Sequence, residues 1–177
     1  MENAREMKDM IRVALHDGHA LVCIEGRGTY KVSSSLKRFA ATTIDQGITE
    51  FVVDMHDCDY MDSTFMGVLA GVALRLRRVG KGNVRMINLL PSAQEALQTV
   101  GIDDLLVPCD ATQIGSELFA TCRGGHGEQL EEATARDGGT LETMLQAHED
   151  LVAASPDTAA QFADVITFLK QAGRDDD

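Results

Sequence analysis

The sequence predicts an α/β fold with a mixed, mostly parallel sheet, and three observations support this. Strand-like and helix-like segments alternate along residues 11–110. Two apolar runs of period two flank Asp17-Gly18, a pair that tolerates the positive φ of tight hairpin turns. Beyond residue 139 the alternation gives way to two amphipathic helical patterns. The expected order is β-β-α-β-α-β-α-β, followed by a C-terminal helical extension.

Each element has its own signal. The hairpin spans residues 11–26, and a helix over residues 33–46 has a serine available as N-cap and Gly47 as its stop. A short apolar strand follows over 48–55, and a polar loop over 56–62 leads into a strong helix. That helix begins at Ser63, carries three arginines in its last turns and stops at Gly80. The remaining elements are a strand over 84–89, a helix over 91–100 with proline in its first turn, and a strand over 105–109.

The chain is therefore expected to divide into a domain over residues 11–110, a linker over 111–139 and a helical hairpin over 140–173. The linker is expected to hold a short helix near 115–122 and otherwise loop. The hairpin has two apolar stripes that must bury each other or dock on the domain. Their members are Leu141, Met144, Leu145, His148, Leu151 and Val152, then Phe162, Val165, Ile166 and Leu169.

Composition limits the function classes. The 177 residues are 44% hydrophobic, enough for a core, and carry a net charge of −12, which argues against a nucleic-acid partner. Residues 1–110 hold 15 acidic and 12 basic side chains, whereas residues 111–177 hold 13 and 4, so the excess acid lies in the extension. The four cysteines form no CxxC pair, and no segment resembles a signal peptide or a membrane span. A reduced, soluble, cytoplasmic protein that binds no membrane is expected.

The acidic stretch over residues 54–62 allows two hypotheses about chemistry. Its oxygen ligands would suit Mg²⁺ or Ca²⁺, although the spacing fits no known loop, and a polar loop before a helix is the simpler interpretation. Asp54 at a strand end would suit a phosphate-accepting receiver domain, but neither an acidic pair after the first strand nor a later lysine is present. No nucleophile elbow and no phosphate-binding glycine loop occurs. Residues alone therefore predict no catalytic site, no metal and no cofactor, and they assign the histidines to surface or packing positions.

The stretches DYMDSTFMGVLAG and NLLPSAQEALQTVGIDDLL, in this order of elements, resemble a STAS domain of the bacterial anti-sigma factor antagonists. The resemblance covers about residues 11–110. In that family the loop before the second helix reads D-S-[ST]-x-[LMI]-G, and its serine is phosphorylated by a partner anti-sigma kinase. Carried over, Asp62 is the preceding acid and Ser63 is the phosphoacceptor. The implied partner-binding residues are Asp62, Ser63, Thr64, Phe65, Met66 and Gly67, together with Thr29 and Tyr30 of the neighbouring loop.

The resemblance implies a switch rather than an enzyme. Unphosphorylated, the protein would sequester an anti-sigma factor with serine kinase activity; phosphorylated, it would release that factor, and a phosphatase would reset it. Two departures favour an alternative, a constitutive STAS scaffold or transport accessory that is not phosphorylated. Phe65 stands where glycine is usual, and the loop Gly26-Arg27-Gly28-Thr29 lacks the family's aspartate. A third interpretation is that Ser63 only caps its helix.

The acidic extension also has two interpretations. It covers apolar surface, or it docks over the partner surface near Arg75, Arg77 and Arg78 by opposite charge.

Overall fold

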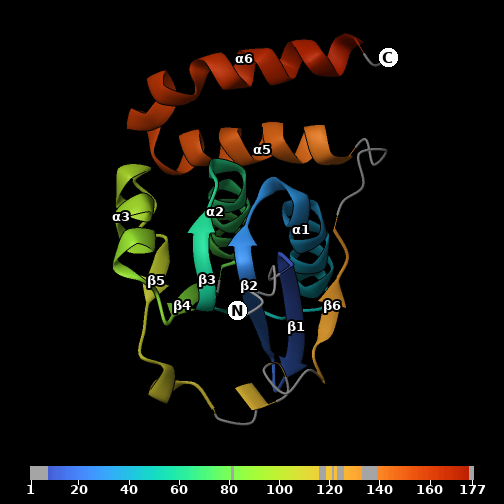
Figure 1. Cartoon of the computed structure of the whole chain (residues 1–177), viewed down its shortest axis with the longest axis vertical. Coiled ribbons are helices and arrows are strands. Elements are labelled where there is room, and N and C mark those ends of the chain that lie inside the picture. Colours follow the sequence, from blue (N-terminus) through green and yellow to red (C-terminus); the bar gives the residue numbers. More distant parts are fainter. Residues whose placement is uncertain are drawn as a thin grey trace, which may run out of the picture.

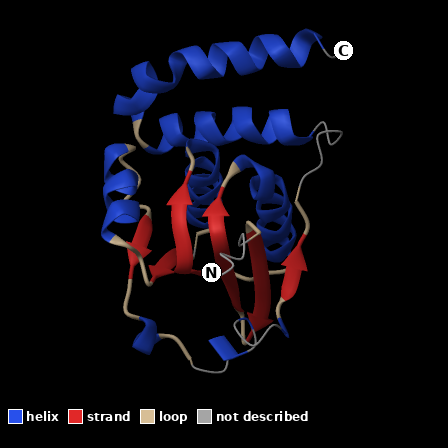
Figure 2. Cartoon of the chain, viewed as in Figure 1, coloured by secondary structure: helices blue, strands red, loops and turns tan. Residues whose placement is uncertain are grey.

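A computed structural model describes residues 8–80, 82–115, 119–120, 122, 126–132 and 139–175. Its core is a six-stranded sheet in the order β5-β4-β3-β2-β1-β6, with helices on one face (Figures 1 and 2). The strands are β1 (Met10–His16), β2 (His19–Gly28), β3 (Glu50–Met61), β4 (Asn83–Ile87), β5 (Leu106–Pro108) and β6 (Glu128–Leu130). The helices of the domain are α1 (Tyr30–Asp45), α2 (Ser63–Arg78) and α3 (Pro91–Thr99). The mixed α/β fold and the order of its first eight elements are as predicted.

The hairpin and the parallel strands arise as their sequences indicate. Asp17 and Gly18 both adopt positive φ, and β1 pairs antiparallel with β2 from Met10 opposite Glu25 to His16 opposite His19. Strands β2 to β5 run parallel to one another and are joined through α1, α2 and α3. The helix stops expected at Gly47 and Gly80 are present, each with positive φ just after a helix.

Three local expectations are wrong. β3 runs on to Met61, so the acidic stretch taken as a loop is a strand whose last residues pair with Arg27 and Gly28. α1 begins at Tyr30 rather than at a serine, because Thr29 is its N-cap residue and the carboxylate of Asp62, just before α2, accepts from the Tyr30 amide. β6 lies inside the supposed linker and pairs antiparallel with β1, covering what would otherwise be an open edge. The short helix expected near 115–122 falls largely outside the described residues.

Apolar side chains fill both faces of the sheet. The larger cluster lies between the sheet and the helices, and includes Ile24, Phe51, Phe65, Leu69 and Leu76. A smaller cluster on the opposite face brings Leu21, Val52 and Ile87 against Ile114 and Cys122 from the segment after β5. Apolar side chains of this chain therefore cover both faces of the sheet.

The extension forms two helices, α5 (Gly139–Ala154) and α6 (Ala159–Asp175), joined by the short 3₁₀ turn η3 (Pro156–Thr158). Figure 1 shows α5 crossing the ends of α1 and α2, with α6 stacked on its outer side. Leu151 of α5 and Phe162 of α6 are buried in the same cluster as the domain core. The extension thus packs on the helices of the domain, mainly on α2.

Candidate functional site

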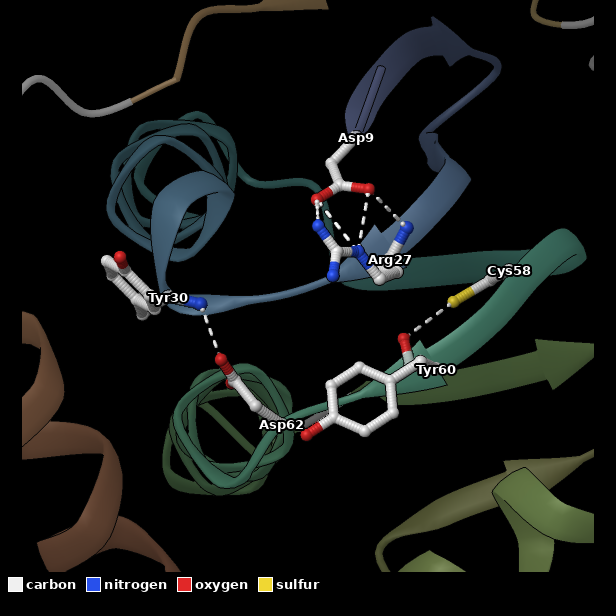
Figure 3. Close-up of polar contacts among 6 residues, drawn as sticks. All are labelled: Asp9, Arg27, Tyr30, Cys58, Tyr60 and Asp62. Atoms are coloured by element: carbon white, nitrogen blue, oxygen red, sulfur yellow. Dashed lines mark hydrogen bonds and ion pairs between the residues drawn. The ribbon is translucent and has the colours of Figure 1, made fainter. Parts of the chain in front are cut away.

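The N-terminus of α2 is organised by Asp62. Its carboxylate accepts a hydrogen bond from the Phe65 amide at 2.8 Å, which caps α2. It accepts another from the Tyr30 amide at 2.8 Å, which caps α1 (Figure 3). Each amide is one that a helix leaves without an internal partner. One side chain therefore fixes the start of two helices, and Ser63 is left as the first residue of α2 rather than its cap. The interpretation of Ser63 as the cap is wrong.

The Ser63 hydroxyl has a partner from the extension. Ser63 Oγ lies 3.0 Å from His148 Nε2 on α5, and His148 Nδ1 lies 2.7 Å from the Met144 carbonyl oxygen. A carbonyl can only accept, so Nδ1 carries a proton, and in the neutral ring Nε2 accepts from the serine hydroxyl. His148 is 3% exposed and packs edge-on against Phe162 of α6. Sequence reasoning assigned this histidine to the apolar stripe of its helix but found no contact with Ser63.

The surroundings of Ser63 hold two exposed aromatic residues. Tyr30 is 43% exposed and Tyr60 54% exposed, and both lie beside Asp62 in Figure 3. The other residues expected to bind a partner are buried. They are Thr29, Thr64, Phe65, Met66 and Gly67. Of the expected set, Tyr30, Asp62 and Ser63 are therefore at least partly accessible, and Tyr60 is exposed beside them.

Phe65 does not stand beside Ser63 on the surface. Its side chain is fully buried, and its ring lies against Gly28 of β2, where an added Cβ would approach Phe65 Cδ1 to 2.6 Å. The bulky ring of Phe65 is therefore accommodated in the core, because Gly28 opposite it has no side chain.

An acid also reaches the loop that lacks the expected aspartate. Asp9, just before β1, lies 3.0 Å from Arg27 Nη2 and accepts from the Arg27 amide at 3.1 Å (Figure 3). This partner raises the pKa of Arg27 above its ordinary value. The Asp9 carboxylate is thus already paired with the Arg27 guanidinium.

Cys58, which lies close to Tyr60, is not an activated nucleophile. Burial raises the pKa of the Cys58 thiol, which donates to the Tyr60 carbonyl oxygen and stays protonated at neutral pH. Within the described part of the chain, no three His, Cys, Asp or Glu side chains converge on a position for a metal ion. The described helices also include none that is long and apolar enough to cross a membrane.

Comparison with known proteins decides the family. The family model described as "Mlab, STAS domain" matches residues 2–108, more than half of the chain. The chain belongs to the STAS family. BtrV of Bordetella bronchiseptica, which is named as an anti-sigma factor antagonist, is 25% identical over 105 residues, covering 59% of this chain and 90% of BtrV.

Solved structures agree with this fold. The anti-sigma factor antagonist SpoIIAA in its unphosphorylated form has 20% identity and a TM-score of 0.50, over 58% of this chain and 90% of SpoIIAA. A Thermotoga maritima protein described as an anti-sigma factor antagonist has 13% identity and a TM-score of 0.52, over 64% of this chain and 94% of its own. Because the family model matches residues 2–108, helices α5 and α6 lie beyond the matched part of the chain.

Proposed function

We propose that this STAS protein is an anti-sigma factor antagonist whose partner binding is controlled by phosphorylation of Ser63. It acts as a binding module and not as an enzyme. The partner is an anti-sigma factor with serine kinase activity, and a phosphatase restores the unphosphorylated form. Its acidic charge suits a regulator that contacts proteins rather than DNA.

The observation that carries the proposal is the position of Ser63 as first residue of α2, directly after its cap Asp62. A phosphoryl group there adds about −1.5 to −2 charges at pH 7, at the positive end of the helix dipole. Free amides at a helix N-terminus favour such an anion, so the fold tolerates it. The consequence falls on binding, because the added charge and hydration lie beside Asp62 on the surface a partner meets.

The surface around Ser63 would bind that partner. We call this surface the rim, and it consists of Tyr30, Tyr60, Asp62 and Ser63. Tyr30 and Tyr60 offer aromatic surface around the acid and hydroxyl of Asp62 and Ser63. Aromatic residues surrounded by polar groups are the side chains most often responsible for binding energy at protein interfaces. A loss of ~3 kcal/mol at this rim lowers affinity about a hundredfold, which is enough for a switch.

A second candidate function is a constitutive STAS scaffold or transport accessory. One observation favours it: the Ser63 hydroxyl is already hydrogen-bonded to His148 and is only partly accessible. In a scaffold this bond would simply fasten the extension, and Ser63 would never be modified.

Phosphopeptide mapping of the protein from its native cells tests the proposal. A phosphate on Ser63 under some growth condition is expected, together with capture of an anti-sigma factor by the Ser63→Ala protein and about a hundredfold weaker capture by Ser63→Asp. A protein that is unmodified under every condition, and whose Ser63→Asp form binds its partners as the wild type does, would be a scaffold.

A further inference from the structure

The contact between α5 and α2 is made by small and polar residues. Gly67 and Gly71 stand one turn apart on α2, and an added Cβ at Gly67 would collide with the Ala147 carbonyl oxygen of α5. At Gly71 it would meet the Asp150 carboxylate. We call these two glycines and the α2 surface between them the glycine seam. Two helices approach this closely only where one of them has glycine, which carries no side chain, at the contact.

The fully buried face of α5 contributes few large apolar side chains to the contact, and Val152 is only partly buried against the cluster of the domain core. The buried residues of α5 are Thr143, Ala147, His148 and Leu151, of which only Leu151 is a large hydrocarbon side chain. The buried residues of α2 are, by contrast, almost all apolar, as expected of a helix that belongs to a core. Interfaces that form and separate are poorer in apolar side chains than domain cores. The composition of α5 is that of a docked segment.

The half-buried Asp150 carboxylate lies in the same contact, against Gly71. Desolvation raises the pKa of this carboxyl, even though Lys37 of α1 and Arg78 of α2 are close enough to oppose the shift. Attraction to these two cations therefore opposes the desolvation of the half-buried carboxylate without reversing the shift of its pKa. Of the three arginines, Arg75 pairs with Asp45 and Arg77 donates to the Asp104 carbonyl, leaving Arg78 as the one that faces Asp150.

We propose that the glycine seam is a helix-docking surface, that α5 is its resident and displaceable occupant, and that a partner displaces α5 with a helix of its own. This proposal rests on the proposed function, because the hairpin of α5 and α6 would then cover Ser63, the residue whose phosphorylation controls partner binding. The partner helix must present an alanine-sized residue to Gly67, as Ala147 does, and an acceptor to Ser63, as His148 does. While α5 is docked, the Ser63 hydroxyl is held and the seam is closed to a partner.

A wedge in α5 tests displacement without any partner. Ala147→Glu, in the full-length chain, places a charge where only a methyl group fits, whereas Ala153→Glu makes the same change at an exposed position of the same helix. Hydrogen exchange should show at least tenfold faster exchange across α5 and α6 in Ala147→Glu, unchanged exchange in β2 and β3, and no change in Ala153→Glu. Loss of protection in β2 and β3 would make the hairpin part of the cooperative fold and overturn the proposal. Unchanged exchange in α5 would overturn it as well.

A synthetic peptide of residues 139–154 then tests the seam in trans. By fluorescence anisotropy it should bind the Ala147→Glu protein at least tenfold more tightly than the Ala153→Glu protein, whose own α5 occupies the site. The same peptide carrying Ala147→Glu should bind neither. Equal or absent binding to the opened protein would contradict a helix-docking seam. Because the probe is a segment of this chain, these results stand or fall separately from the identity of the partner and from phosphorylation of Ser63.

Discussion

Ser63 Oγ is hydrogen-bonded to His148 Nε2 over 3.0 Å, linking the first residue of α2 to a buried side chain 85 positions later. The ring is oriented by its second nitrogen, which donates to the Met144 carbonyl oxygen. Because this bond joins the candidate phosphoacceptor to the extension, a change at Ser63 should alter how stably α5 is docked. The strength of that coupling can be measured.

A double-mutant cycle should find coupling between Ser63 and His148. Ser63→Ala leaves Nε2 buried without a donor, and His148→Phe keeps a ring against Phe162 while removing the acceptor. The pair should show a coupling energy of ~1 kcal/mol in urea denaturation, the usual net contribution of one hydrogen bond. His56→Phe, at an exposed site, is the matched control and should be additive with Ser63→Ala. A coupling no larger than the control's would mean that the bond contributes nothing to docking.

Much of this architecture can be predicted because it depends on local patterns. The Asp17-Gly18 turn and the helix stops at Gly47 and Gly80 follow from backbone preferences that neighbouring residues do not override. The position of Ser63 before an apolar helix is likewise visible in the sequence. These features need no knowledge of distant partners.

What could not be predicted depends on contacts between distant segments. β3 extends through an acidic stretch because β2 offers paired backbone as far as Gly28, and polar composition does not reveal this. α1 begins at Tyr30 because Asp62, 32 residues later, accepts from its amide. The role of His148 was equally hidden. Its place on an apolar stripe indicated burial, but which residue it would meet depended on how α5 docks.

Asp62 should be worth more to stability than an ordinary helix cap. Asp62→Ala removes the bonds to both Tyr30 and Phe65, with an expected loss of ~2 kcal/mol, about 1 for the cap and about 1 for the second bond. Asp62→Asn keeps one acceptor oxygen and should lose about half as much. Asp110, whose carboxylate accepts from the nearby Thr112 and caps only one short 3₁₀ turn, is the control, and Asp110→Ala should cost less than Asp62→Ala. Equal losses in urea denaturation would contradict the double role.

Gly28 and Phe65 should behave as a matched pair. Gly28 has no positive φ, so the effect of Gly28→Ala comes from its new Cβ, which would lie 2.6–2.9 Å from three Phe65 ring atoms. Overpacking of this kind typically destabilises by ~1–3 kcal/mol. Phe65→Leu in the same chain should recover part of the loss, because the smaller side chain leaves room for the methyl group.

Thermal unfolding of the two single variants and the double variant measures this. Gly115→Ala is the control, since nothing lies within 4 Å of its added Cβ, and its Tm should match the wild type. A double variant less stable than the sum of the single changes would show that the two positions are not sterically matched.

Asp150 should make docking of α5 sensitive to pH. Its pKa is raised in the folded protein by burial, so the folded state binds more protons than the unfolded state above the ordinary value of 3.8. Stability from this group is therefore greatest below that value and falls as pH rises through the raised pKa. Lys37, Arg78, Gln146 and Glu149 face the same carboxyl, and the first three lower its pKa without reversing the shift.

Asp150→Asn should consequently stabilise the protein at neutral pH. The amide is uncharged and can still accept from Gln146, so the Tm of the variant should exceed that of the wild type at pH 7, and the difference should vanish near pH 3, where the wild-type carboxyl is itself protonated. The exposed Asp157→Asn serves as control and should show no such dependence. If Asp150→Asn instead lowered the Tm at pH 7, attraction to Lys37 and Arg78 would outweigh desolvation, and the charge would hold α5 on the seam rather than loosen it.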